Sequence, residues 1–140
     1  RKLKNSLREL FNQTNLICLY YLIVCFLIFL IINFFIDDLV ILLYGPKLLQ
    51  FVDAFYFWFI VYIFTALYFP LSIYFTKINN TKILSLSSFT MVILSMLSYL
   101  FIKIFNYQGA LISLLLIFMI PTIIVMIFYF TSNYKLSKII

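Results

Sequence analysis

The sequence predicts an all-α, polytopic membrane protein with four transmembrane helices in a single transmembrane domain over residues 1–140. Two observations support this fold class. Hydrophobic residues make up 66% of the chain and charged residues 10%, whereas soluble domains are about half apolar and a quarter charged. The apolar residues also fall into long runs separated by short polar segments. A water-soluble fold of this size could not bury so much apolar surface, because small domains leave much of their chain exposed.

Each apolar run is long enough to cross a bilayer, since about 20 helical residues span the hydrocarbon core. The predicted spans are residues 16–36, 55–75, 84–104 and 111–131. Residues 1–14 are basic and polar, with leucines at helical spacing, and they predict an amphipathic lead-in helix on the inner membrane surface.

A short interfacial helix is predicted after the first span. Asp37 and Asp38 interrupt the apolar run there, and aspartate is a favourable helix cap. The apolar turn that follows reaches Gly45 and Pro46, a dipeptide that stops helices. Residues 47–54 then lead into the second span. This stretch is too short and too interrupted to cross the bilayer, so we expect it to lie in the interface.

The positive charges predict that both termini lie inside. Inner loops of membrane proteins carry an excess of Lys and Arg, and this excess sets how the helices insert. With the N-terminus inside, Lys47 and Lys103 fall outside, and the other eight of the ten basic residues fall inside. Those eight are Arg1, Lys2, Lys4, Arg8, Lys77, Lys82, Lys135 and Lys138. The excess of basic residues therefore indicates how the helices are oriented in the bilayer, and we expect no nucleic-acid partner.

The sequence offers no candidate catalytic, cofactor-binding or metal-binding residue. Histidine is absent, and the acidic and basic residues lie at the ends of the predicted spans. An ionisable side chain at mid-depth would be a functional candidate because of its cost in lipid. A nucleophile–base pair and a Gly-rich phosphate loop are both missing from the pattern. We therefore expect a protein that is not an enzyme and that uses no cofactor.

Serines and prolines are the candidate packing residues. Ser88, Ser95 and Ser98 share one face of the third span, and small polar residues let membrane helices approach closely and form hydrogen bonds. Pro70 in the second span and Pro121 in the fourth are expected to bend their helices, because proline lacks the backbone N–H. These residues predict a role in helix packing and shape.

Two patterns flank the first span. The segment Leu7-Arg8-Glu9-Leu10 precedes it, and residues 33–48 run without a gap from aromatic through acidic and leucine residues to a Gly-Pro dipeptide. Together with LYFPLSIYF, IPTIIVMIFYF and the basic YKLSK, they resemble the TatC family, the receptor subunit of the twin-arginine protein translocase. The positions that match are Leu7, Glu9, Leu10, Phe34, Phe35, Asp37, Asp38, Leu39 and Pro46.

The resemblance covers the first four of the family's six spans and implies a role in protein export. It makes Glu9 a candidate contact for a partner or for a signal peptide, because twin-arginine signal peptides are cationic. Two features depart from the family. Met119 and Ile120 stand where an acidic residue usually precedes the proline of the fourth span, and the outer loop at residues 106–110 is short.

Three functional hypotheses remain open. The first is a shortened TatC-like protein that acts in packing and assembly within a larger inner-membrane complex, with lipid and other membrane protein subunits as its partners. Residues encoded by AT-rich codons are abundant, as in an organelle genome or a low-GC bacterium. We expect the mitochondrial inner membrane as the location, with the bacterial plasma membrane as the alternative. The second is a working twin-arginine translocase receptor. The third is a small bacterial immunity or holin-like membrane protein.

Overall fold

The computed structural model describes the backbone of residues 2–138 and the side chains of residues 6–47, 49, 52 and 54–132. Every regular element in this part of the chain is a helix, and no strand occurs in it. The elements are α1 (Lys2–Tyr44), the 3-10 helix η1 (Pro46–Phe51), α2 (Val52–Lys77) and α3 (Thr81–Lys138). The prediction of an all-α fold is confirmed.

Three helices are long and apolar enough to cross a membrane, over Ser6–Tyr44, Ala54–Lys77 and Thr81–Ser132. Large apolar side chains such as Phe34, Leu42 and Met96 are exposed along them. A helix pairs its backbone N–H and C=O groups internally, and this is necessary in hydrocarbon, which offers no hydrogen-bond partner. These helices indicate an integral membrane protein.

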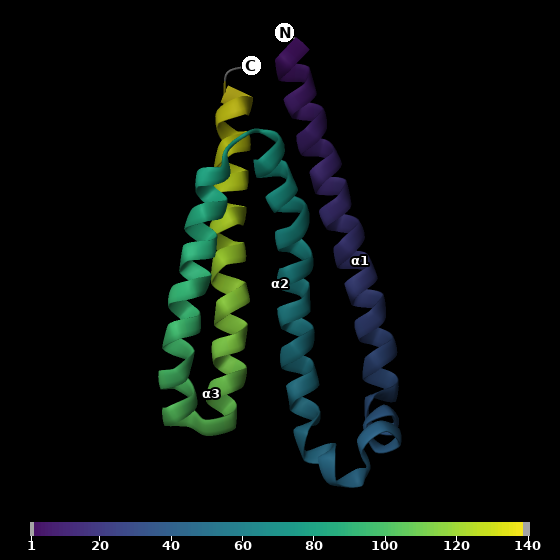
Figure 1. The fold of residues 1–140 in the computed structure, drawn as a ribbon. Coiled ribbons are helices and arrows are strands. Elements are labelled where there is room, and N and C mark those ends of the chain that lie inside the picture. Colours follow the sequence, from purple (N-terminus) through teal and green to yellow (C-terminus); the bar gives the residue numbers. More distant parts are fainter. Residues whose placement is uncertain (1, 139–140) are drawn as a thin grey trace.

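The first helix is longer than predicted. α1 continues from the lead-in through Asp37 and Asp38 to Tyr44, so the expected helix end at these aspartates is wrong. Aspartate inside a helix costs at most about 0.7 kcal/mol, which the flanking apolar residues easily outweigh. The helix ends at Gly45, whose φ of 82° suits glycine. The ribbon of α1 turns aside at its lower end before entering η1 (Figure 1).

A Schellman motif ends α2 directly after Lys77. The amide of Asn79 donates to the carbonyl oxygen of Thr76 (3.1 Å), and the amide of Asn80 donates to that of Phe75 (3.0 Å). Asn79 has the left-handed φ of 59° that this motif requires, and asparagine tolerates this conformation better than most residues. The polar loop after the second predicted span is therefore a tight turn into α3.

The helix assigned as α3 turns back on itself at Asn106, where φ is 52° and ψ is −127°. Its first half (residues 81–105) and its second half (residues 107–138) run in opposite directions (Figure 1). Ile83 and Val125 belong to one buried cluster, although a straight helix would place them roughly 60 Å apart. The turn falls inside the short polar segment at which the sequence predicts one.

The elements connect at two ends of the molecule. The described parts of both termini and the turn at Asn79 lie at the upper end in Figure 1, which we call the terminal end. η1 and the turn at Asn106 lie at the opposite end, which we call the η1 end. The side chains of Arg1, Lys2, Lys4, Lys135 and Lys138, which contribute to the predicted inner charge, are outside the described residues.

Gly109 is the residue on which the turn in α3 depends most directly. A Cβ atom at this position would meet the backbone carbonyl oxygen of Phe101 inside van der Waals contact, so Gly109→Ala must force the turn open. Overpacking of this kind costs about 1–3 kcal/mol. We expect a lower midpoint of thermal unfolding for Gly109→Ala in detergent.

Asn106→Gly is the matched control at the same turn, because glycine adopts a positive φ without steric cost. This variant should unfold at the same temperature as the parent chain or higher. An unchanged unfolding midpoint for Gly109→Ala would contradict the close approach of Gly109 to Phe101.

Candidate functional site

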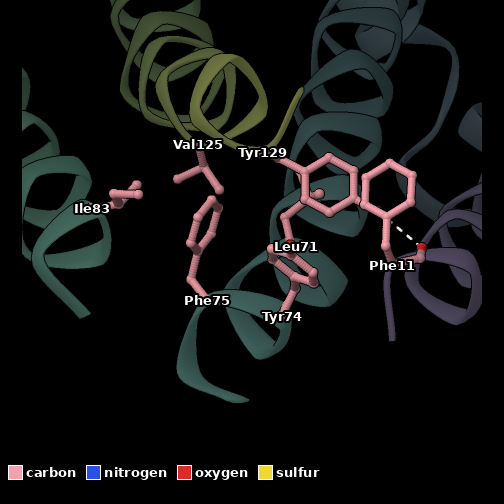
Figure 2. Packing of buried hydrophobic residues seen from close by; sticks show 7 residues of the cluster. All are labelled: Phe11, Leu71, Tyr74, Phe75, Ile83, Val125 and Tyr129. Carbon is pink, nitrogen blue, oxygen red and sulfur yellow. Dashed lines mark hydrogen bonds between the residues drawn. The ribbon is translucent and has the colours of Figure 1, made fainter. Parts of the chain in front are cut away.

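A buried aromatic cluster joins α1, α2 and α3 near the terminal end (Figure 2). The ring of Tyr129 stacks on Phe11 with centroids 4.7 Å apart and meets the edge of Tyr74 at 4.8 Å. Stacked and edge-on aromatic pairs contribute about 0.5–1.5 kcal/mol beyond the area they bury. Phe75 and Leu71 of α2 complete the packing on the side of Val125.

The hydroxyl of Tyr129 adds a polar contact to this cluster. It lies 2.8 Å from the amide oxygen of Asn15 and 3.1 Å from the backbone carbonyl oxygen of Phe11, so its single proton is donated to α1. The contact to Phe11 is the dashed line in Figure 2. The second half of α3 is thereby tied to the N-terminal part of α1.

Hydrogen bonds also link α2 to each of its neighbours. The hydroxyl of Thr122 lies 3.2 Å from the carbonyl oxygen of Phe64, and the hydroxyls of Tyr68 and Ser87 lie 2.9 Å apart. Because Ser87 donates its own proton to the carbonyl oxygen of Leu84, Tyr68 is the donor to Ser87. Near the η1 end, the hydroxyl of Tyr56 donates to the side-chain oxygen of Asn33 at 3.1 Å.

The predicted serine face lies outside these contacts. Ser88 and Ser95 are exposed and Ser98 is half-buried. The hydroxyls of Ser95 and Ser98 donate to carbonyl oxygens of their own helix. Ser87, which the sequence pattern did not single out, is fully buried and contacts α2. A contact within the chain is thus made by Ser87, and the role of Ser88, Ser95 and Ser98 in helix packing stays a prediction.

Both candidate prolines are buried, and the helices continue through them. Pro121 lies beside Thr122, whose hydroxyl shares its single proton between the carbonyl oxygens of Phe118 in its own helix (2.8 Å) and Phe64 of α2 (3.2 Å). This places Pro121 where α3 packs on α2. The bends expected at Pro70 and Pro121 stay predictions.

Among the side chains that the structure describes, the ionisable residues form no cluster that resembles a metal centre. Glu9 is exposed on α1 near the terminal end. Among the described residues, no group of three or more His, Cys, Asp or Glu side chains could hold a metal ion. Cys18 and Cys25 are free thiols.

An apolar pocket of about 480 Å³ opens between α1, α2 and the second half of α3. On one side Phe29 contacts Phe59, with ring centroids 5.0 Å apart. Trp58 and Tyr62 of α2 line the pocket and are each 56% exposed. The full lining is Ile28, Phe29, Ile32, Ile36, Phe55, Tyr56, Trp58, Phe59, Val61, Tyr62, Thr65 and Phe118. We call this feature the lateral pocket, and its lining suits an apolar helix or an acyl chain.

Comparisons of the chain with protein-family models, with curated proteins and with solved structures find no match. The class that the fold defines is an all-helical protein with three apolar helices that could cross a membrane. The resemblance to the TatC family stays a prediction from the residues that carry it.

Two tyrosines of the aromatic cluster form a matched pair for measuring the polar contact. Tyr129→Phe removes the hydroxyl that reaches Asn15 and leaves the ring packing unchanged, so it should lower the free energy of unfolding by about 1 kcal/mol. Tyr74→Phe removes a buried hydroxyl that has no hydrogen-bond partner among the described residues, so it should be neutral or stabilising. Unfolding of both variants in lipid-free detergent measures the difference. Equal losses from the two would contradict the role of Tyr129.

Proposed function

We propose that this chain is a non-enzymatic, multi-pass subunit of a larger membrane complex and that it crosses the membrane four times with both termini inside. The turn at Asn106 supports four crossings, because it divides the longest helix into two. The first half (residues 81–105) extends roughly 37 Å and the second half (residues 107–138) roughly 48 Å, and both exceed the hydrocarbon core of about 30 Å. The arrangement of the two ends in Figure 1 agrees with this topology.

The lateral pocket is the observation that carries the proposal of a partner. Helices in lipid gain little from hydrophobicity and associate through close packing and polar contacts. The pocket offers a concave surface with the aromatic side chains of Trp58 and Tyr62 at exposed positions. The hydroxyl of Thr65 donates its proton to the carbonyl oxygen of Val61. The hydroxyl oxygen retains lone pairs that could accept a hydrogen bond from a partner. A transmembrane helix of another subunit therefore fits this surface.

Within this proposal, the chain is a TatC-like protein that acts in packing and assembly, and the mitochondrial inner membrane is its location. The resemblance at residues 33–48 and the amino-acid composition support these two points. The bacterial plasma membrane is the alternative location.

Labelling of single cysteines tests the four crossings. With Cys18 and Cys25 replaced by alanine, cysteines at the exposed positions Asn79 and Gln108 should react with an impermeant maleimide from opposite sides of sealed vesicles. Asn79 should be reached only from the inner side and Gln108 only from the outer side. Labelling of both from one side would contradict the topology.

Photo-cross-linking tests the partner. A photoreactive phenylalanine analogue in place of Tyr62, which lines the lateral pocket, should form a covalent adduct with another membrane protein in native membranes. The same analogue in place of Tyr99, which is 68% exposed on the first half of α3 and lies outside the pocket, is the control and should react with lipid. Equal protein adducts from both positions, or none from Tyr62, would contradict a partner in the pocket.

The exposure of Glu9 supports a second candidate, a working twin-arginine receptor. A carboxylate on this surface could pair with the cationic signal peptide of an exported protein. The cross-linking experiment separates the two candidates when the analogue replaces Arg8 or Asn12, the exposed neighbours of Glu9 on α1. An adduct with a twin-arginine precursor there would favour the receptor. Its absence, together with an adduct at Tyr62, would favour the packing subunit.

A further inference from the structure

A second hollow lies at the terminal end, between the start of α1 and the end of α2. It has a volume of about 590 Å³, and its polar lining includes Ser6, Lys77 and Asn79. Tyr74, which is 1% exposed, lines it as well. The hydroxyl of Tyr74 is buried without a hydrogen-bond partner in the described part of the chain. The polar side chains of the lining make this hollow suitable for a ligand that supplies polar atoms.

Lys77 at the end of α2 places a cation in the hollow, and the carbonyl oxygens next to it are already engaged in hydrogen bonds. The Schellman motif and the amide of Ile78 occupy the carbonyl oxygens of Tyr74, Phe75 and Thr76. Lys77, the last residue of α2, is exposed and lines the hollow. Glu9, the nearby acidic residue of α1, does not line it. The charge in the hollow is therefore positive and suits an anion.

An apolar groove leads from this hollow along the molecule. Its α1 wall contains Leu10, Thr14, Ile17 and Tyr21, which share one face because they follow helical spacing. The other wall comes from Phe69, Ile73 and Lys77 of α2. Leu10 and Lys77 line both the hollow and the groove, so the two features are continuous.

The length of the groove matches one leaflet of a bilayer. From Leu10 to Tyr21 the helix rises roughly 16 Å, and half of the hydrocarbon core is about 15 Å thick. A cationic, hydroxyl-bearing hollow joined to an apolar groove of this length is complementary to an anionic headgroup joined to an acyl chain.

We propose that this hollow and groove bind an anionic glycerophospholipid from the leaflet at the terminal end. Its phosphate lies beside Lys77 and near Asn79, and one acyl chain follows the groove past Ile17 and Ile73. Juxtamembrane lysines attract anionic lipid, and the amide of the Asn79 side chain can donate a hydrogen bond to the phosphate. This lipid site requires no partner protein, so its test is independent of the proposed subunit role.

Thermal unfolding of the purified full chain in detergent tests the site. Phosphatidylglycerol should raise the unfolding midpoint more than phosphatidylcholine with the same acyl chains, because only the first carries a net negative charge. Lys77→Gln should weaken phosphatidylglycerol binding about five-fold, as expected for one lysine near an anionic headgroup. Lys82→Gln is the matched control, since Lys82 is exposed at the same end and lines neither feature, and it should retain the parent affinity.

A second pair of variants tests the groove and does not change charge. Ile17→Trp places a bulky ring in the groove and should abolish the phosphatidylglycerol-dependent shift, whereas Ile23→Trp, on an exposed part of α1 outside the groove, should keep it. The lipid-dependent shift of each variant is compared with its own lipid-free midpoint, because removing a helix-terminal charge also changes the baseline.

Three outcomes would overturn the proposal. The first is an equal shift with phosphatidylcholine, which would remove the role of charge. The second is an equal shift with glycerol phosphate, which would show an anion site that needs no acyl chain. The third is an equal loss of affinity in Lys77→Gln and Lys82→Gln, which would show diffuse attraction to the basic surface.

Discussion

Hydrogen bonds between helices are the interactions on which this fold depends most. Lipid tails are as apolar as the side chains, so an apolar side chain gains little free energy by moving from lipid to a neighbouring helix. Tyr129 reaches α1 from the second half of α3, while Thr122 and Tyr68 connect α2 to the two halves of α3. A hydrogen bond between membrane helices contributes only about 0.6 kcal/mol on average. A specific arrangement of the helices therefore requires several such bonds acting together. α2 takes part in most of them and is therefore the helix on which the others are assembled.

The two ends of the molecule differ in how these contacts are supported. Near the terminal end, the rings of Phe11, Tyr74 and Tyr129 pack around the buried hydrogen bond from the Tyr129 hydroxyl to the carbonyl oxygen of Phe11, so this bond is shielded from competing groups. Near the η1 end, the hydrogen bond between Tyr56 and Asn33 is exposed, and the lateral pocket opens beside it. A shielded bond is stronger than an exposed one, because the low dielectric constant of the interior strengthens it. The helices are thus held most firmly at the terminal end and leave room for another molecule toward the η1 end.

The sequence predicted the helices and the turns better than the faces that pack. Long apolar runs separated by short polar segments were enough to locate the turn at Asn106 and the end of α2, because Asn106 and Asn79 adopt the positive φ that these turns require. The end of α1 was misplaced, since Asp37 and Asp38 suggest a cap while a helix tolerates both. Ser87 was missed because the spans are apolar on all sides, so periodicity does not reveal which side faces a neighbour. The lateral pocket depends on how three helices approach one another, which no local pattern encodes.

The position of α1 follows from the same reasoning. Only 6% of its most apolar window is buried, against 28% in α3, so its surface faces surroundings other than this chain. It is attached near the terminal end through Phe11 and Asn15 and near the η1 end through Phe29 and Asn33. Between these attachments the groove and the lateral pocket separate parts of α1 from α2. A void in this position would forfeit dispersion contacts on both walls, and a lipid chain or a partner helix restores them. The spacing of α1 and α2 is therefore set jointly by the hydrogen bond between Tyr56 and Asn33, by the aromatic contacts and by the molecules that fill the openings beside them.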